Sequence, residues 1–446
     1  MAYPTFKEAF KVWLKVALYS FGGPAGQIAV MHKYIVEDKK WLGENRFLHA
    51  LNYCMLLPGP EAQQLATYIG WLLHKTRGGL LAGGLFVLPG FISILILSIL
   101  YALWKDLTFV QGIFYGIKAA VLAVVIGAVI KIGKRALKNE VMVGIAVLAF
   151  IAIFFFKISF PYIVLAAGLL GYFGGKVWEE KFYIIKGHAD VKESETGLID
   201  QFIQAERPAL VKTLGVALFW LALWLVPVLV LVAVLGTDNV FSKEALFFSQ
   251  SAVVTFGGAY SVLAYISQKA VETYGWLQPG EMLDGLGMAE TTPGPLIQVV
   301  QFVGFMGAFR NAGSLDPILA GVLASVLVTW VTYLPSFLFI FTGAPYIEHL
   351  RGNKSLSTAL SGITAAVVGV ILNLGIWFSL HTLFAQVGEQ RVGAFYLPVP
   401  VWSSIDWGAI LITFAALVFT FRLKWDMLRT IGVCMGMGLV LKLFVL

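Results

Sequence analysis

The sequence predicts an all-α integral membrane protein that is built from two homologous halves. Three observations predict this fold class. The residues are 59% hydrophobic and only 13% charged, several apolar stretches are long enough to span a bilayer, and two short motifs of glycine and proline occur twice in the same register. Soluble domains contain about 25% charged residues, so the composition favours a membrane protein over a soluble one.

Nine apolar stretches are predicted to cross the membrane. Several approach or exceed the ~20 residues that a helix needs to span the hydrocarbon, and the others are shorter. The nine stretches are residues 80–104, 112–130, 141–156, 158–175, 209–235, 318–343, 358–380, 404–421 and 428–446. About nine full crossings are thus expected. Four short segments carry the glycine and proline motifs, and we interpret them as re-entrant or broken helices.

The two halves align without gaps at an offset of 235 residues. Phe21-Gly22-Gly23 then pairs with Phe256-Gly257-Gly258, and Pro58-Gly59-Pro60 pairs with Pro293-Gly294-Pro295. Fourteen of the 43 positions from Phe21 to Gln63 are identical, which is too many for shared hydrophobicity alone. Further along, "LPGF" at 88–91 matches "LPSF" at 334–337. The chain is therefore predicted to be an internal duplication, the commonest construction of a secondary transporter.

Loop charge predicts how the halves are oriented. Five loops are rich in Lys and Arg, and all five can be cytoplasmic if the nine stretches cross in sequence. Base-poor loops such as "TDNVFSKE" at 237–244 are then outside. Four crossings plus the one at 209–235 separate equivalent points, and an odd number inverts the second half. We therefore predict inverted-topology repeats, with parallel repeats as the alternative if one short segment crosses alone.

These observations divide the chain into four parts. Residues 1–175 form a first membrane repeat, 176–208 a cytoplasmic linker, 209–235 a connecting transmembrane helix and 236–446 a second membrane repeat. The linker is short and mixed in charge, which is typical of a tether.

Each Pro-Gly-Pro predicts a half-helix that begins inside the protein. Pro60 has a preset φ and no amide hydrogen, so it suits the first turn of a helix, while Pro58 and Gly59 end the preceding one. The first amides of such a helix have no helical partner, and they carry a partial positive charge that favours an anion. The alternative is that the glycines and prolines only permit kinks and close packing.

The predicted substrate site gathers the motif residues of both halves and the polar residues beside them. Neutral carboxamides suit a solute that must bind and leave again. The candidates are Gly22, Gly23, Pro24, Gln27, Pro58, Gly59, Pro60, Gln63, Gln64, Gly257, Gly258, Thr292, Pro293, Gly294, Pro295 and Gln298. Phe-Gly-Gly is expected to let its backbone pass close to the other broken element or to open its amides to the ligand.

Three charged residues within apolar sequence are candidates for proton coupling or charge balance. Glu61 follows the first Pro-Gly-Pro and Glu290 precedes the second. Either carboxylate can carry a coupling proton, because low dielectric and a nearby anion favour the neutral form; alternatively, Glu61 caps the amides of its own helix. Lys118 can balance a dianion or extend to the membrane surface.

Enzymatic and metal-binding classes find no motif. The six histidines form no HExxH, and neither a Walker-type loop nor a GxGxxG loop follows a predicted strand. We therefore expect no catalytic residue, no metal and no cofactor. The net charge of +7 is explained by cytoplasmic loops, so no nucleic-acid partner is implied. Membrane lipid is an expected partner, and a homodimer is compatible with the sequence.

The segments "FGGPAGQIA", "LPGPEAQQLATYIGW", "FVLPGF", "TFGGAYSVLAYI" and "TTPGPLIQVVQFVG" resemble the chromate ion transporter family in its long, two-domain form. The resemblance spans both halves. It implies a multi-pass carrier of the inner (cytoplasmic) membrane that exports chromate, a tetrahedral dianion similar to sulfate, driven by an ion gradient. We expect a secondary active antiporter with the proton as coupling ion and chromate resistance as its consequence. A passive anion channel, or a transporter of another small anion, is the alternative.

The halves are not identical around the motifs. After Gly-Gly, the first copy has Pro24, Gly26 and Gln27, whereas the second has Tyr260, Ser261 and Val262 in the corresponding stretch. The first half is therefore expected to be the more polar side of the site.

Overall fold

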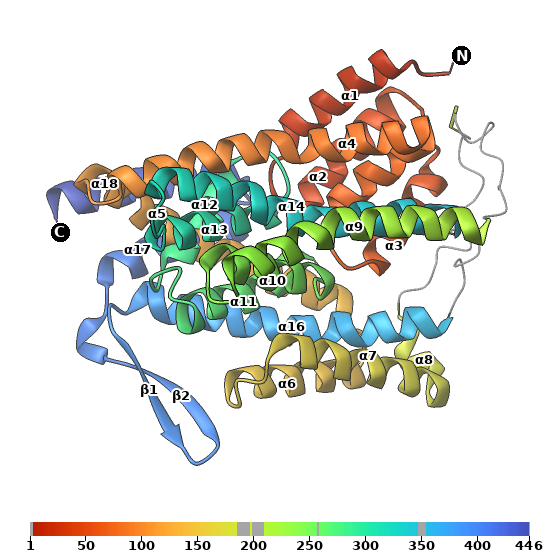
Figure 1. Cartoon of the computed structure of the whole chain (residues 1–446). Coiled ribbons are helices and arrows are strands. Elements are labelled where there is room, and N and C mark those ends of the chain that lie inside the picture. Colours follow the sequence, from red (N-terminus) through yellow and green to blue (C-terminus); the bar gives the residue numbers. More distant parts are fainter. Residues whose placement is uncertain (1–2, 185–196, 199–208, 257, 347–353, 446) are drawn as a thin grey trace. The chain divides into compact units, whose positions relative to one another are not determined.

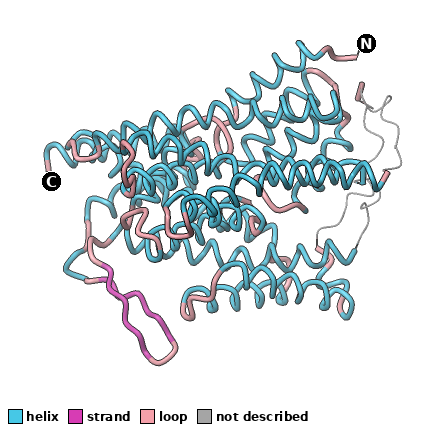
Figure 2. The backbone as a smooth tube through the Cα atoms, viewed as in Figure 1, coloured by secondary structure: helices cyan, strands magenta, loops and turns pink. Residues whose placement is uncertain are grey.

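The computed structural model describes residues 3–184, 197–198, 209–256, 258–346 and 354–445. Within these residues the chain is helical apart from one two-stranded hairpin (Figures 1 and 2). The predicted linker, 176–208, lies largely outside the described residues.

The first half consists of eight α-helices and one π-helical turn. The elements are α1 (Phe6–Tyr19), α2 (Gly23–His32), η1 (Lys33–Asp38), α3 (Glu44–Leu56), α4 (Glu61–Trp104), α5 (Thr108–Ala136), α6 (Glu140–Phe154), α7 (Phe160–Val177) and the short α8 (Glu179–Phe182). Helix α4 is interrupted at His74 and Lys75, whose backbone angles are not helical. Its first part is the half-helix predicted to follow Pro60.

The second half repeats this order after α9 (Leu210–Leu235). Its elements are α10 (Val240–Val253), α11 (Ala259–Gln268), η3 (Lys269–Thr273), α12 (Glu281–Thr291), η4 (Leu296–Gln298), α13 (Val299–Arg310), α14 (Pro317–Gly343), η5 (Ala344–Tyr346), α16 (Lys354–Leu383), β1 (Val387–Val392), β2 (Phe395–Pro400), η6 (Trp402–Ser404), α17 (Trp407–Leu417), η7 (Val418–Arg422) and α18 (Met427–Phe444). A π-helical turn follows both α2 and α11, so the halves share even this uncommon feature.

Seven helices are long and apolar enough to cross a bilayer: α4, α5, α7, α9, the segment Pro317–Tyr346, α16 and α18. Three shorter apolar segments, Glu140–Phe154, Leu296–Arg310 and Trp407–Arg422, accompany them. The prediction of a multi-span helical membrane protein is therefore confirmed. Helix α9 is the most apolar of the seven, and large side chains such as Val211 and Leu229 are exposed on it, as lipid contact requires.

The chain folds into two compact units, and neither corresponds to one half. The first unit contains residues 1–96, 186–259 and 292–353, and the second contains 97–185, 260–291 and 354–446. Each unit therefore draws segments from both repeats. The first contains both Pro-Gly-Pro motifs.

In the first unit, α9 packs on α14 and α10 through a stripe of buried side chains, Trp220, Trp224 and Val228. Their four-residue spacing places them on one helical face. The Trp220 ring stacks on Phe337 with centroids 5.6 Å apart. Trp224 Nε1 donates to Ser249 Oγ at 3.1 Å, so the polar end of this buried ring is satisfied.

In the second unit, α16 runs along α6 and α7 (Figure 1), while α5 packs closely on α18. Small residues permit the α5–α18 approach. A Cβ atom added at Gly438 of α18 would lie 2.5 Å from the carbonyl oxygen of Gly112 and 2.7 Å from Gly116 Cα. Small residues at helix contacts are typical of membrane proteins, because close backbone approach replaces the hydrophobic driving force.

The hairpin β1–β2 was not predicted. Its strands pair antiparallel from Val387 with Pro400 to Val392 with Phe395, and Gly393 in the turn takes φ +62°. The polar sequence of β1 has little strand propensity, so no local pattern revealed it. The hairpin depends on contacts that are distant in sequence: the Tyr396 amide donates to the Phe155 carbonyl at 2.9 Å.

Replacing Gly438 with alanine is expected to destabilise the α5–α18 contact by at least about 1–3 kcal/mol, because the new methyl group overlaps backbone atoms of α5. The matched control is Gly432→Ala on the same helix. A Cβ atom there meets nothing within 4 Å, and alanine raises helix propensity. Thermal unfolding of the purified protein in detergent measures both variants, and equal stability of the two would contradict the packing described for α18.

Candidate functional site

Both Pro-Gly-Pro motifs separate two helices within the first unit or at its boundary. Helix α3 ends at Leu56 and α4 begins at Glu61, directly after Pro60, as predicted. In the second copy α12 ends at Thr291, and the 3₁₀ turn η4 begins at Leu296 and leads into α13. The central glycines have matching backbone conformations, with φ of +125° at Gly59 and +113° at Gly294. Side-chain-bearing residues rarely adopt such angles.

The two motifs are held by a reciprocal pair of backbone hydrogen bonds, which we call the crossed pair. The Gly59 amide donates to the Thr255 carbonyl at 2.8 Å, and the Gly294 amide donates to the Ser20 carbonyl at 3.0 Å. Ser20 and Thr255 each directly precede a Phe-Gly-Gly, and both bonds obey the offset of 235 residues. Each half thus satisfies the interrupted backbone of the other.

The Phe-Gly-Gly glycines serve a conformational purpose. Gly22, Gly23 and Gly258 take φ of +83°, +69° and +99°, and a Cβ atom added at any of them would meet nothing within 4 Å. The expected close passage of the backbone at Gly22 and Gly23 therefore does not occur, because the glycines are required for left-handed turns and not for space. Gly257 lies outside the described residues.

Close approach occurs instead at the Pro-Gly-Pro glycines. A Cβ atom at Gly59 would lie 2.8 Å from Ser336 Oγ, and one at Gly294 would lie 3.0 Å from Gly90 Cα. Gly90 and Ser336 are equivalent residues of "LPGF" and "LPSF". Each Pro-Gly-Pro thus packs against the proline-containing helix of the opposite half, and this contact was missed in the sequence although the matching tetrapeptides were visible.

Buried carboxamides surround these contacts in the first unit. Gln27 Nε2 donates to the Gly294 carbonyl at 2.6 Å, and Gln64 Nε2 donates to the Pro58 carbonyl at 2.7 Å. Gln63 Nε2 donates to Thr67 Oγ1 at 3.1 Å, and Gln298 Nε2 to Gln301 Oε1 at 2.5 Å. All five glutamines are at most 1% exposed.

These carboxamides retain hydrogen-bonding capacity. In the described part of the chain, the side-chain oxygens of Gln27, Gln63, Gln64 and Gln298 have no hydrogen-bond partner, and neither has Ser336 Oγ. A carboxamide that rotates by 180° exchanges its donor and acceptor ends, so the same side chains can present N–H groups. We call Gln27, Gln63, Gln64, Gln298 and Ser336 the carboxamide cluster.

The remaining motif residues complete this region without adding charge. Pro24 lies in the first turn of α2, Pro293 and Pro295 flank Gly294, and Thr292 is buried directly before them. The asymmetry expected from the sequence is visible in the contacts: Gln27 donates across to Gly294, whereas its equivalent, Val262, has no polar group with which to do so.

The three charged candidates are divided between the units. Glu61 begins α4 in the first unit and is half-buried. Glu290 and Lys118 belong to the second unit. Glu290 is buried and accepts a hydrogen bond from the Tyr260 hydroxyl. It lies on α12, which is too short to span a bilayer, and burial raises the pKa of its carboxyl to about 7.

Lys118 has a protein partner. Its Nζ lies 3.3 Å from Asp284 of α12, and Tyr101 also donates to Asp284, at 2.8 Å. Next to this pair, Lys105 lies 3.4 Å from Glu281. This cluster of charges was not predicted, because Glu281 and Asp284 stand in a stretch that resembles an exposed polar loop in sequence. The ion pair competes with both roles considered for Lys118.

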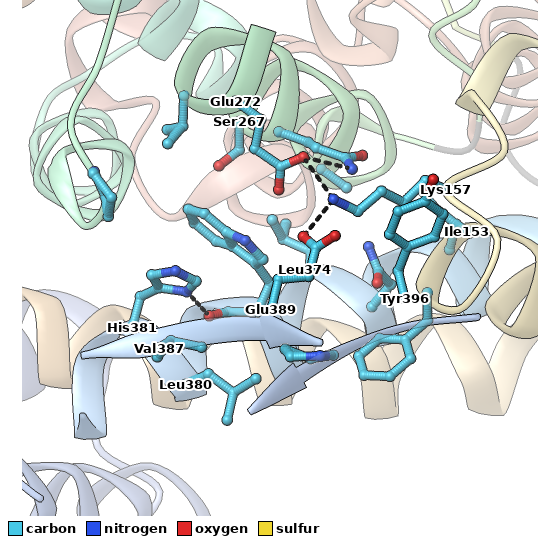
Figure 3. A pocket seen from close by; sticks show the side chains of 18 of the residues that line it. Ile153, Lys157, Ser267, Glu272, Leu374, Leu380, His381, Val387, Glu389 and Tyr396 are labelled. Atoms are coloured by element: carbon cyan, nitrogen blue, oxygen red, sulfur yellow. Dashed lines mark hydrogen bonds and ion pairs between the residues drawn. The ribbon is translucent and has the colours of Figure 1, made fainter. Parts of the chain in front are cut away.

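A cavity of about 500 Å³ lies in the second unit beside the hairpin (Figure 3). Lys157 Nζ projects between Glu389, at 2.6 Å, and Glu272, at 3.7 Å. None of the predicted site residues lines the cavity. Because two carboxylates flank one ammonium group, this cluster has no spare positive charge for an anion. The residues that the structure describes also include no group of three His, Cys, Asp or Glu able to hold a metal ion.

One buried acid was assigned to the wrong kind of segment. The sequence placed "TDNVFSKE" in an external loop, but α10 begins at Val240, capped by the Asn239 side chain. Glu244 is consequently on a helix and is 0% exposed. The asparagine before a run of apolar residues was the available signal for the helix start.

Comparison with known proteins agrees with these features. The family model described as "Chromate transporter" matches residues 7–172 and 243–439, one segment in each half. The chain is 32% identical over 410 residues to the chromate transport protein of Pseudomonas aeruginosa, covering 91% of this chain and 86% of that protein. It is 27% identical to the chromate transport protein of Cupriavidus metallidurans, with 82% and 81% covered.

A probable chromate transport protein of Synechococcus elongatus is 26% identical, with 85% of this chain and 86% of that protein covered. No solved structure matches the chain. Two matched segments, one in each half of a multi-span helical protein, identify it as a transporter and not an enzyme. The chain belongs to the chromate transporter family, in its long form with both halves present.

Proposed function

We propose that this protein is a secondary active carrier that exports chromate, or a similar tetrahedral oxyanion such as sulfate, across the cytoplasmic membrane. The observation that carries the proposal is the crossed pair, in which Gly59 and Gly294 each donate to the residue before the other half's Phe-Gly-Gly. This arrangement gathers both broken helices and the carboxamide cluster in one buried region. The names of the relatives support chromate as the substrate.

The chemistry of the region suits weak, reversible binding of an oxyanion. A tetrahedral dianion needs hydrogen-bond donors on several sides when it leaves water. Rotated carboxamides of Gln27, Gln63, Gln64 and Gln298, the Ser336 hydroxyl and the helix start after Pro60 can supply such donors. None of these groups carries a full positive charge, so the anion is not trapped by an ion pair and can leave, as transport requires.

The transport cycle proposed here uses the duplication. Inverted-topology repeats with broken helices at their interface place a substrate site near the membrane midplane and open it alternately to each side. We propose this topology for the present chain, with nine crossings counted from α4 to α18 and the four short segments re-entering. The matching glycine conformations at Gly59 and Gly294 and the shared π-helical turns support two halves of equal construction.

The coupling ion in this proposal is the proton. Glu61 is half-buried at the first turn of α4, where a carboxylate is stabilised by the helix dipole. Glu290 and Lys118 of the second unit remain candidates for charge compensation, with Tyr260 and Asp284 as their respective partners.

Reconstituted into liposomes, the protein is expected to move chromate with saturable kinetics that depend on an imposed pH gradient, and sulfate is expected to compete. Radiolabelled or colorimetric flux assays measure this directly, with molybdate as a second competitor. Flux that rises linearly with chromate concentration and ignores the pH gradient would indicate a passive channel. Sulfate flux without chromate flux would change the substrate.

Substituting Gln63 with leucine is expected to raise the KM for chromate about tenfold or more. A hydrogen bond to a charged group contributes about 1.5–3 kcal/mol, and about 1.4 kcal/mol corresponds to a factor of ten. The matched control is Gln278→Leu, an exposed position in the second unit, which is expected to leave the KM unchanged. Thermal unfolding of both variants separates a binding defect from misfolding, and a well-folded Gln63→Leu protein with normal KM removes Gln63 from the site.

A further inference from the structure

Glu244 is a buried acid that the proposed transport cycle does not yet use. It lies in the second turn of α10, in the first unit, and it is 0% exposed. Most of α10 around it is buried as well, including Ser242, Ala245 and Phe248. Acidic side chains are almost never fully buried unless they are paired, so an acid at this place requires an explanation.

No partner satisfies this carboxylate. Within the described residues, neither Oε1 nor Oε2 of Glu244 has a hydrogen-bond partner. The neighbouring lysine, Lys243, is directed elsewhere, with its Nζ 3.4 Å from Asp238. Burial raises the pKa of Glu244 well above its usual value, and no neighbouring charge contributes to this shift.

The helices packed against α10 offer little charge. They are α14, α9 and α13. The titratable residues of these helices are Tyr333 on α14, Lys212 in the first turn of α9 and Arg310 at the end of α13. None of the three donates to Glu244. An ionised carboxylate without a counter-ion or donor is very costly in such surroundings, whereas the protonated form is tolerated.

Glu244 contacts the helix that carries the second Pro-Gly-Pro. A Cβ atom added at Gly304 of α13 would lie 3.6 Å from Glu244 Oε2. Gly304 is one turn beyond Gln301, and Gln301 is bonded to Gln298 of the carboxamide cluster. Six residues separate Gln298 from Gly304, which is about 9 Å along a helix. The carboxylate therefore lies beside the helix whose start belongs to the proposed anion site.

We propose that Glu244 is the proton-binding site of the carrier and that it is protonated when the oxyanion is bound at the start of α13. This inference rests on the proposed function, because it concerns the coupling of the same site. A dianion and an ionised carboxylate about two turns apart repel each other, so protonation of Glu244 favours binding of the anion and the reverse.

Coupling of this sign moves the proton together with the anion, in contrast to the antiport predicted from the sequence. A chromate dianion accompanied by one proton still carries one net negative charge. An inside-negative membrane potential therefore still drives the pair outward. For Glu244 to release its proton, water must reach α10, so deprotonation is linked to an opened form of the first unit.

The test compares wild-type protein with Glu244→Gln, which is permanently neutral and similar in shape. In proteoliposomes, the wild-type KM for chromate is expected to fall on the order of tenfold between pH 8.5 and pH 5.5. Glu244→Gln is expected to show a low KM at every pH, like the wild type at acidic pH. Because chromate itself takes up a proton near neutral pH, variant and wild type are compared at each pH, and sulfate, which remains a dianion, serves as a second substrate.

Two controls complete the experiment. Asp238→Asn removes an exposed carboxylate of the same segment and is expected to retain the wild-type pH profile. Stabilisation of the detergent-solubilised protein by sulfate during thermal unfolding measures binding without transport, so a variant that folds but does not transport is still informative. A Glu244→Gln protein that keeps the wild-type pH dependence in both measurements overturns the inference. Absence of chromate flux in the wild-type protein instead refutes the proposed function.

Discussion

The structure depends on how an interrupted helix satisfies its backbone away from water. Each Pro-Gly-Pro ends one helix and begins another, and a free amide in an apolar interior costs several kcal/mol. The crossed pair removes this cost for the two central glycines by joining Gly59 to Thr255 and Gly294 to Ser20. Since each bond takes its donor from one half and its acceptor from the other, neither half can complete its own break. The duplication is therefore a structural requirement of the first unit.

The crossed pair also determines where polar side chains gather. Around it the first unit buries neutral carboxamides, of which Gln27 and Gln64 donate to carbonyls of the Pro-Gly-Pro motifs themselves. Charged side chains of the second unit are instead paired with one another, as Lys118 with Asp284 and Lys157 with Glu389. A buried ion pair that lost one partner would leave an uncompensated charge. Those pairs are therefore suited to holding helices together, and the neutral cluster is suited to a transient ligand.

The sequence predicted the features that single residues impose and missed those that require a distant partner. Proline and glycine act locally, so the helix start after Pro60 and the break at Gly59 were visible in the sequence. The identity of the group that accepts the Gly59 amide was not, because every residue type offers the same carbonyl. The hairpin β1–β2 was missed for the same reason: its polar first strand is stabilised through Tyr396 and Phe155, not by its own propensity.

Duplication followed by divergence separates two tasks that one symmetric site would have to combine. The backbone remained symmetric, since Gly59 and Gly294 keep the same conformation and the same type of bond. The side chains did not. Gln27 faces no polar equivalent at Val262, and Glu244 corresponds at the same offset to Ala9, a buried alanine of α1. An acid at both positions would place two unpaired carboxylates in one unit and repel the anion twice. With the carboxamide donor in one half and the acid in the other, the same fold can bind an oxyanion and still sense a proton.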